Sequence, residues 1–326
     1  MIRFLTRRCL QAVPLLLAIS VLVFALMHAA PGGPLAIYLS NPNVGAEDIE
    51  RLRRALGLDR PVWQQYWSWL GAFVRGDWGY SFSDGRPVAS RILERLPATI
   101  ELVGVSIVVA LALTLPVGVL SAIRRGRWFD RVATTAAVTG ISVPAFWLGL
   151  VLQIVFAIGL GWLPSSGRTT PGWAGGPGGA GTGGELMDHL QHLVLPVTVL
   201  AVVQASAWSR YVRGSMIETL AQPFVLAARA RGLPSRALIL GHALRHAIGP
   251  VLAVVMVDAA LLASGAVVTE SVFAWPGLGS LFTEALARRD YTVLMALLMI
   301  TSAAIVALNI AADLAHALVD PRVTAV

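Results

Sequence analysis

Two histidines have the spacing at which side chains share one face of a helix. His242 and His246 stand four residues apart, as the zinc ligands of a metalloprotease helix do. That chemistry also requires a glutamate directly after the first histidine, and this chain has Ala243 there. Arg245 adds a positive charge beside the pair, which opposes the binding of a metal cation. The pattern therefore predicts a basic docking surface and no metal site.

A second pair, His189 and His192, stands three residues apart at the start of a long apolar run, where we expect an interfacial role. Signals for covalent or nucleotide chemistry are missing from the sequence. It has no Gly-x-Ser-x-Gly motif and no lysine for a P-loop. Its one cysteine, Cys9, excludes an intrachain disulfide and a cysteine-based metal cluster. No catalytic residue is predicted.

Acidic side chains inside apolar runs are the remaining candidates for chemistry. A charge within a membrane span costs free energy and usually faces a cavity or a partner. Glu101 and Asp313 lie near the ends of their runs, which favours structural pairing. Asp258 is central in its run, so it either faces a polar pathway or pairs with donor groups on another element. Both interpretations of Asp258 are open at this point.

Composition explains why these residues sit among apolar runs. The chain has 326 residues, of which 56% are hydrophobic and 13% charged, about half the charge content of a typical soluble domain. Apolar runs of about 20 residues predict a polytopic membrane protein. The first run is longer than a signal-peptide core and lacks an Ala-x-Ala site, so we expect it to be a retained span. The six runs cover residues 9–30, 100–120, 132–160, 190–208, 247–268 and 291–318.

The net charge of +7 comes from arginine alone, because all 25 basic residues are Arg. A basic balance suggests nucleic-acid binding in a soluble protein, but here the arginines cluster beside the apolar runs. Arginine is retained in short cytoplasmic loops, which predicts six spans with both termini inside. Residues 31–97 and 159–189 are then outside, and residues 122–131 and 213–246 are inside.

The predicted domains follow from this topology. Residues 1–30 form the N-terminus and first span, residues 31–97 an outer lobe, and residues 98–320 a core with the remaining five spans. The lobe is expected to hold helices at 46–56 and at the tryptophan-rich segment 62–74. We expect Pro144 to kink the third span, and residues 271–290 to form an outer loop.

The stretch 222–250 carries four arginines and no acidic residue. Residues 227–230 favour a helix, Gly232 permits a turn, and Pro234 can begin a second helix. A basic helix-turn-helix between spans is too short to be a domain. We therefore expect it to dock onto a cytoplasmic partner.

This stretch resembles the EAA loop of permease subunits of binding-protein-dependent ABC importers, through Ala227, Ala228 and Gly232. Leu226 replaces the usual Glu, and residues 242–245 replace an Ile-x-Leu-Pro ending, both of which resemble the peptide-transporter branch. RLPATIEL at 95–102 and SVPAFWLG at 142–149 are similar to segments of dipeptide and oligopeptide permeases of the B type. Gly33 departs from that pattern, which has Asp. Further similar segments are 30–32, 56–61, 75–82, 161–164 and 273–279.

The resemblance implies a fold, partners and a site. The fold is an all-α polytopic membrane protein with six transmembrane helices of the type I ABC importer permease, and a small extracytoplasmic lobe between helices 1 and 2. The partners are a second homologous permease, two ATP-binding subunits and an extracytoplasmic peptide-binding protein, with no nucleic acid. The chain itself binds no cofactor, since ATP and Mg belong to the ATP-binding subunits. The implied coupling residues, within the cytoplasmic loop 213–246, are Ala227, Ala228, Arg229, Arg231 and Gly232.

The implied function is ATP-driven import of dipeptides or oligopeptides across the bacterial cytoplasmic membrane. Asp258 would line the pathway and receive the amino terminus or basic groups of peptides, or would pair structurally. One alternative is import of nickel or another small solute by the same fold. An ion-coupled secondary transporter would need several coupled carboxylates in the spans, and those here are few and scattered. A third alternative, an intramembrane enzyme, is disfavoured because the sequence lacks nucleophile and metal-binding motifs.

Overall fold

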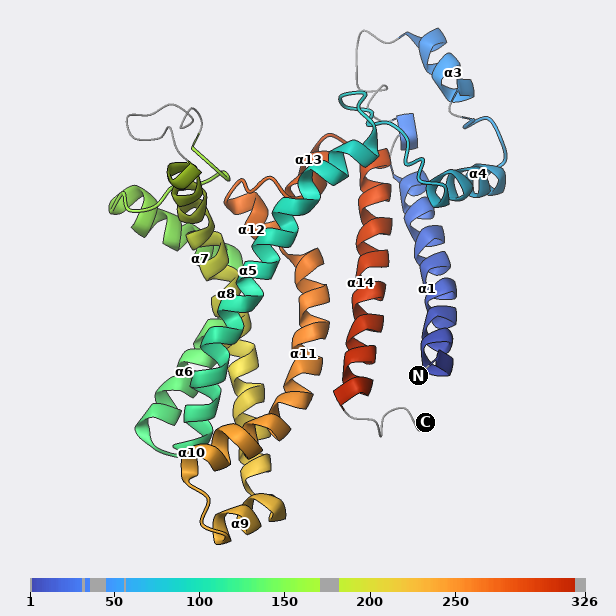
Figure 1. The fold of residues 1–326 in the computed structure, drawn as a ribbon. Helices are drawn as coiled ribbons and strands as arrows, with labels where there is room; N and C mark the ends of the chain where they lie inside the picture. The colour runs from blue at the N-terminus through green and yellow to red at the C-terminus, as the bar shows by residue number, and fades with distance from the viewer. Residues whose placement is uncertain (1, 31–32, 36–44, 56, 171–181, 320–326) are drawn as a thin grey trace. The chain divides into compact units, whose positions relative to one another are not determined.

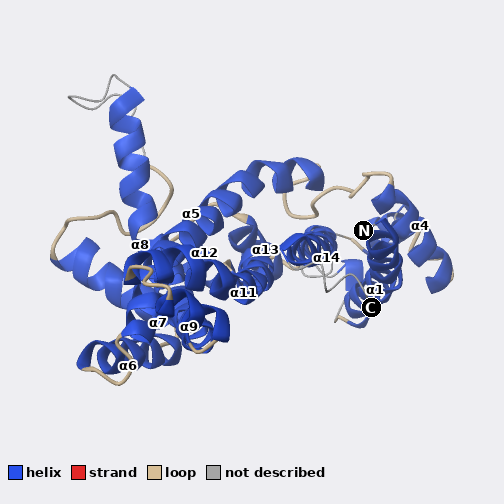
Figure 2. Cartoon of the chain, turned by 60° about the horizontal axis from the view of Figure 1, so that its bottom comes forward, coloured by secondary structure: helices blue, strands red, loops and turns tan. Residues whose placement is uncertain are grey.

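The computed structural model describes residues 2–30, 33–35, 45–55, 57–170 and 182–319, which form helices and connections without a β-strand (Figures 1 and 2). The all-α prediction is confirmed for these residues. Two compact units are present, and each is described by itself. The first comprises Met1–Thr99 and Pro276–Ala307, and the second comprises Ile100–Trp275 and Leu308–Val326.

The first unit contains α1 (Ile2–Ala29), η1 (Gly33–Leu35), α3 (Ala46–Ala55), α4 (Val62–Val74) and α13 (Leu278–Ala287). The second contains α6 (Trp128–Ser142), α7 (Ala145–Leu152), η2 (Gln153–Gly159), α8 (Thr182–Leu220), α9 (Pro223–Ala230), α10 (Ser235–Ala237), η4 (Leu238–Ala243), α11 (Leu244–Gly265) and α12 (Val267–Val272). Two long helices, α5 (Val88–Ile123) and α14 (Tyr291–Val319), contribute residues to both units.

Five helical segments of the described residues are long and apolar enough to cross a membrane, namely Thr6–Ala29, Val88–Ile123, Gly184–Leu220, Ser235–Ala259 and Tyr291–Leu314. The pair Trp128–Ser142 and Ala145–Gly159 makes a sixth if its two helices form one span. The helices α5 and α8 begin at Val88 and Thr182, before the spans that we predicted to start at residues 100 and 190. Each of these predicted spans is therefore part of a longer helix.

The third predicted span is broken at Pro144, where its two helices meet at 100°. Val143 has extended backbone angles, φ −80° and ψ 123°, because the residue before a proline is disfavoured in the α conformation. Pro144 lacks an N–H and precedes the first turn of α7. The predicted kink is at the correct residue, but it is a break between two helices.

The predicted outer loop at 271–290 is wrong, because it contains the ten-residue helix α13. Leu281 and Ala285 lie four residues apart and are buried against Val88 and Ile92 of α5, all within the first unit. The sequence alone did not show that the apolar residues after Gly277 would pack against another helix.

The first unit is held together around the C-terminal half of α1. Val23 and Phe24 of α1 pack with Met295 of α14. Tyr66 and Trp69 of α4 pack on the same cluster, and the Ser20 hydroxyl lies 2.8 Å from the Tyr66 hydroxyl. The tryptophan-rich segment 62–74 is a helix, as its pattern predicted, and the structure adds that it packs on α1.

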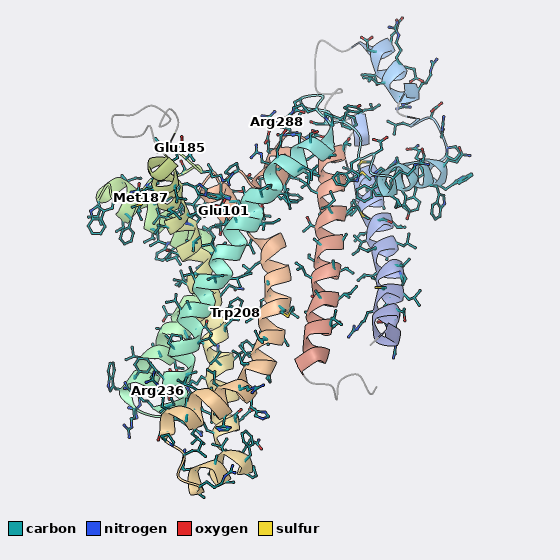
Figure 3. The ribbon with its side chains drawn as sticks, in the orientation of Figure 1. Glu101, Glu185, Met187, Trp208, Arg236 and Arg288 are labelled. Atoms are coloured by element: carbon teal, nitrogen blue, oxygen red, sulfur yellow. The ribbon has the colours of Figure 1, made fainter. Side chains whose placement is uncertain are left out.

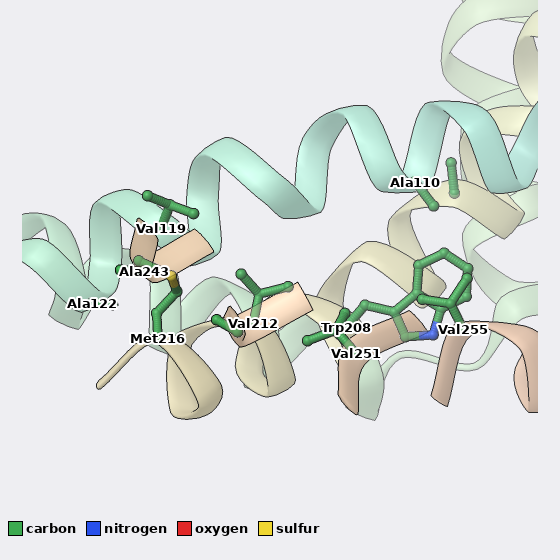
Figure 4. Packing of buried hydrophobic residues seen from close by; sticks show 11 residues of the cluster. Ala110, Val119, Ala122, Trp208, Val212, Met216, Ala243, Val251 and Val255 are labelled. Atoms are coloured by element: carbon green, nitrogen blue, oxygen red, sulfur yellow. The ribbon is translucent and has the colours of Figure 1, made fainter. Parts of the chain in front are cut away.

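The second unit has its core where α5, α8 and α11 meet (Figure 4). Trp208, Met216 and Val251 are among its buried members. Small residues let the helices approach closely, as is typical in membranes. A Cβ added to Gly118 of α5 would lie 2.6 Å from Val212, and one added to Gly140 of α6 would lie 2.1 Å from the Ser206 hydroxyl.

Candidate functional site

The basic stretch folds as a helix, a tight turn and a second helix, as the sequence predicts. Gln222 has extended angles ahead of α9, and Pro223 occupies the first turn, where its missing N–H costs nothing. At the other end, the Gly232 N–H donates to the Arg229 carbonyl at 3.0 Å. Gly232 has φ +81°, a left-handed conformation that glycine adopts without strain. Pro234 then precedes α10.

A small core of its own stabilises this turn. Val225 and Ala228 of α9 and Leu238 of η4 are buried against one another, with Leu220 and Leu233 packed beside them. Ala228 therefore faces inward and is only 2% exposed. Of the two alanines named as coupling residues, Ala227 is therefore exposed on the loop surface and Ala228 is not, so Ala228 is not available for direct docking.

The exposed surface of the loop combines cations with apolar side chains. Arg229 and Arg231 are exposed, and neither forms an ion pair within the part of the chain that the structure describes. Arg236 projects from α10 (Figure 3). Leu226 and Leu240 are each about half exposed, at 52% and 51%. A cationic surface with exposed leucines fits a protein partner, because exposed apolar patches mark interaction sites.

The sequence did not single out two apolar members of this surface, Phe224 and Leu240, and Leu226 was noted only as a departure from the EAA pattern. The spacing of the apolar residues contained a signal for them. Val225 and Ala228 lie three residues apart and form the buried face of α9, so the remaining apolar residues of the helix are left on its exposed side. Phe224 lies off that face and packs against the ring of His246 at a centroid distance of 4.7 Å. His246 therefore contacts the loop it follows, and His242 is exposed.

Polar contacts connect the loop to the long helices beside it. The Ser215 hydroxyl of α8 donates to the Ala247 carbonyl of α11 at 2.8 Å. Arg213 of α8 donates from Nε and Nη2 to Asp130 of α6, at 2.6 and 2.9 Å. A two-point pair of this kind fixes orientation as well as distance. These contacts join α8 to α6 and α11, and Leu220 of α8 packs on the small core that includes α9.

Asp258 lies on α11 and accepts a hydrogen bond from the indole Nε1 of Trp208 at 2.7 Å. Trp208 belongs to α8 and is fully buried in the core cluster (Figures 3 and 4). Asp258 itself is partly buried. The donor is thus a side chain of the same protein, a pairing that the sequence could not identify among the possible partners.

The histidines near the start of α8 also have partners. His189 lies between a carboxylate oxygen of Glu101 and the Arg168 carbonyl, and Arg168 donates to the other Glu101 oxygen at 2.8 Å. The Nδ1 atom of His192 lies 2.8 Å from the Asp188 carbonyl. Glu101 is therefore paired, as its position near a span end predicted.

Comparison with known proteins covers nearly the whole chain. Residues 114–325 match the binding-protein-dependent transport system inner membrane component family, and residues 1–103 match the N-terminal region of such membrane components. The oligopeptide transport system permease protein AppB of Bacillus subtilis (strain 168) is 37% identical over 99% of both chains. The glutathione transport system permease protein GsiC of Escherichia coli (strain K12) is 35% identical over 99% of both chains.

Proposed function

The chain belongs to the family of binding-protein-dependent transport system inner membrane components, and we propose that it is the permease subunit of an ATP-driven peptide importer. It is a multi-pass protein of the inner membrane with the all-α type I permease fold. The observation that carries the substrate class is full-length similarity to permeases named for oligopeptide and glutathione transport. Glutathione is itself a short peptide, so both names indicate the same class of cargo.

The proposed assembly contains a second homologous permease, two ATP-binding subunits and an extracytoplasmic peptide-binding protein. ATP and Mg would be held by the ATP-binding subunits. The sequence supports this division of labour, because a chain without lysine has no P-loop lysine for the nucleotide phosphates. Hydrolysis of ATP is thus assigned to partners, and this chain contributes the path and the coupling.

We assign the coupling to the exposed surface around α9, which comprises Ala227, Arg229, Arg231 and Gly232 with Leu226. The two arginines can pair with acidic groups or carbonyls on an ATP-binding subunit. Ala227 allows the partner to approach closely. Ala228 contributes from inside, because it holds α9 against η4. Closure of the ATP-binding subunits would then move α8 and α11 together with the loop.

The test of coupling uses one substitution on the docking surface. Ala227→Trp should block docking by bulk without disturbing the small core of the loop, because Ala227 is exposed. The complete importer is expressed, and co-purification of the ATP-binding subunits and uptake of a labelled peptide are measured. We expect the permease to reach normal levels in the membrane while both read-outs fall at least about tenfold, a loss of about 1.4 kcal/mol or more in docking free energy.

Two further variants control this experiment. Ala46→Trp makes the same change at an exposed alanine of the lobe and should leave co-purification unchanged. Ala228→Trp overfills the small core and should also lower the amount of folded permease. Normal docking and uptake in Ala227→Trp would remove this surface from the coupling mechanism.

The substrate class has a separate test in the same importer. Labelled dipeptides, tripeptides and longer peptides are supplied in turn, and nickel uptake is measured in parallel. Peptide uptake that requires the binding protein and ATP supports the proposal. Nickel uptake without peptide uptake would favour the alternative of a small-solute permease.

A further inference from the structure

A cavity of about 350 Å³ lies in the first unit, between α1, α4, the segment after α3 and the start of α14. One part of its lining is apolar and includes Phe24, Met27 and Trp69. The other part is polar and basic, with His28, Arg54, Arg60 and Gln65. Its size is within the range of small-ligand sites. The coupling and transport proposals above make no use of it.

Hydrogen bonds fix the polar wall of the cavity around His28. Its Nδ1 lies 3.0 Å from the Phe24 carbonyl oxygen, and its Nε2 lies 3.0 Å from Oε1 of Gln65. The Nε2 atom of Gln65 donates to the carbonyls of Leu58 and Arg60. His28 and Gln65 thus join α1, α4 and the segment after α3 along this wall.

Two arginines give the cavity its charge, and no acidic residue lines the cavity among the described residues. Arg60 is exposed. Arg54 is also exposed, and its Nε lies 3.6 Å from Glu50, which neutralises part of its charge. The balance of Arg54 and Arg60 against Glu50 is positive. The preferred ligand is therefore an anion.

The position of the cavity along α1 indicates which kind of anion would reach it. It lies where the apolar segment Thr6–Ala29 of α1 ends. On the N-terminal side of the cavity, Leu22 and Leu26 of α1 are each 58% exposed, as expected of a face that contacts acyl chains. Beside it, α4 exposes Trp63 and Trp67, residues that concentrate at membrane–water interfaces. A cationic cavity at this depth meets phospholipid headgroups.

We propose that this cavity binds the phosphate headgroup of an anionic phospholipid whose acyl chains lie along the exposed face of α1. Arg54 and Arg60 attract the phosphate. Phe24, Met27 and Trp69 contact the glycerol and the upper part of the chains. The bound lipid holds α1 and α4 together at the membrane surface.

The test is native mass spectrometry of the full chain, purified in detergent and supplied with dioleoyl-phosphatidylglycerol or dioleoyl-phosphatidylcholine. We expect phosphatidylglycerol to be retained at least about tenfold more strongly. The double variant Arg54→Gln/Arg60→Gln should lose this preference by about the same factor. Arg53→Gln is the matched control, because Arg53 is an exposed arginine of the same helix that does not line the cavity.

A second variant tests the cavity rather than the charge. Ala72→Trp fills the cavity and keeps both arginines, so it should also reduce retention of phosphatidylglycerol. Size-exclusion profiles verify that each variant is folded. Equal retention of the two lipids, an equal loss in Arg53→Gln, or full retention in Ala72→Trp would each overturn the proposal. Displacement by an equal concentration of glycerol 3-phosphate would assign the cavity to small phosphates and overturn the lipid assignment.

Discussion

The indole N–H of Trp208 is buried and donates to Asp258, and this bond is one of the contacts that join α8 to α11. A buried donor that loses its acceptor costs about 1–3 kcal/mol. The bond gives Asp258 a structural role. That role does not require a negative charge, because the oxygen of an uncharged amide can also accept a hydrogen bond from an indole. Charge and hydrogen bond can therefore be separated by substitution.

Asp258→Asn tests the charge, because the amide oxygen can still accept from Trp208. We expect the importer to assemble normally and to lose preference for peptides with basic groups, if the carboxylate faces the pathway. Uptake of a labelled peptide library is the measurement, with Trp208→Phe as the control that removes the donor and keeps the carboxylate. Unchanged peptide selection in Asp258→Asn would leave Asp258 with the structural role alone.

Close approach of helices is the main feature at the scale of elements. Gly118 of α5 lies against Val212 and the Ser209 carbonyl of α8, at 2.6 and 3.0 Å from a Cβ placed on the glycine. The second contact is to backbone, which cannot move aside as a flexible side chain can. Gly104 lies on the same helix, and no atom lies within 4 Å of its added Cβ.

Gly118→Ala should therefore destabilise the protein by about 1–3 kcal/mol, through overpacking between α5 and α8. Gly104→Ala is the matched control and should be neutral or stabilising by up to about 1 kcal/mol, since alanine is the better helix former. Thermal unfolding of the purified chain in detergent gives both values. Equal melting temperatures for the two variants would show that α8 can move away without cost.

The turn after α9 is the second element that a substitution can probe. Gly232 has φ +81° and open space around its Cβ position, so any cost of replacement arises from the backbone alone. Gly232→Val should strain the turn by about 1–3 kcal/mol and lower peptide uptake and co-purification of the ATP-binding subunits. Gly232→Asn is the control, because asparagine tolerates the left-handed conformation. Equal activity of both variants would show that the turn does not control docking.

For the whole molecule, the distribution of arginine predicts that both termini and the loop 213–246 face the cytoplasm, and that the lobe 31–97 lies outside. A thiol probe of the lobe could be placed at Asn43, but Asn43 is not among the residues that the structure describes. Glu47 is a suitable replacement, because its side chain is 90% exposed. Ser235 is an exposed position of the loop.

The topology test begins with Cys9→Ser, which removes the single native thiol. A membrane-impermeant maleimide added to intact cells should then label Glu47→Cys and not Ser235→Cys. Permeabilised cells provide the control, in which both positions should react. Labelling of Ser235→Cys alone in intact cells would invert the topology, and the coupling assignment would fail with it.

Several features followed from the sequence alone because they depend on local chemistry. Apolar runs of membrane length, the series of segments similar to peptide permeases, and the helix at Val62–Val74 needed no knowledge of neighbours. Gly232 permitted the turn that the structure contains, since backbone conformation at glycine is decided by sterics within the residue. The residues of the coupling surface were also named, although their role stays a prediction.

Only the tertiary structure decided which side of each helix faces protein. In a membrane span nearly every residue is apolar, so hydrophobicity does not distinguish a lipid-facing side from a packed one. The inward position of Ala228, the pairing of Asp258 with Trp208 and the helix α13 at 278–287 all depend on a partner far along the chain or on an adjoining helix. The 100° break at Pro144 has the same origin, because a proline permits many bend angles and packing selects one.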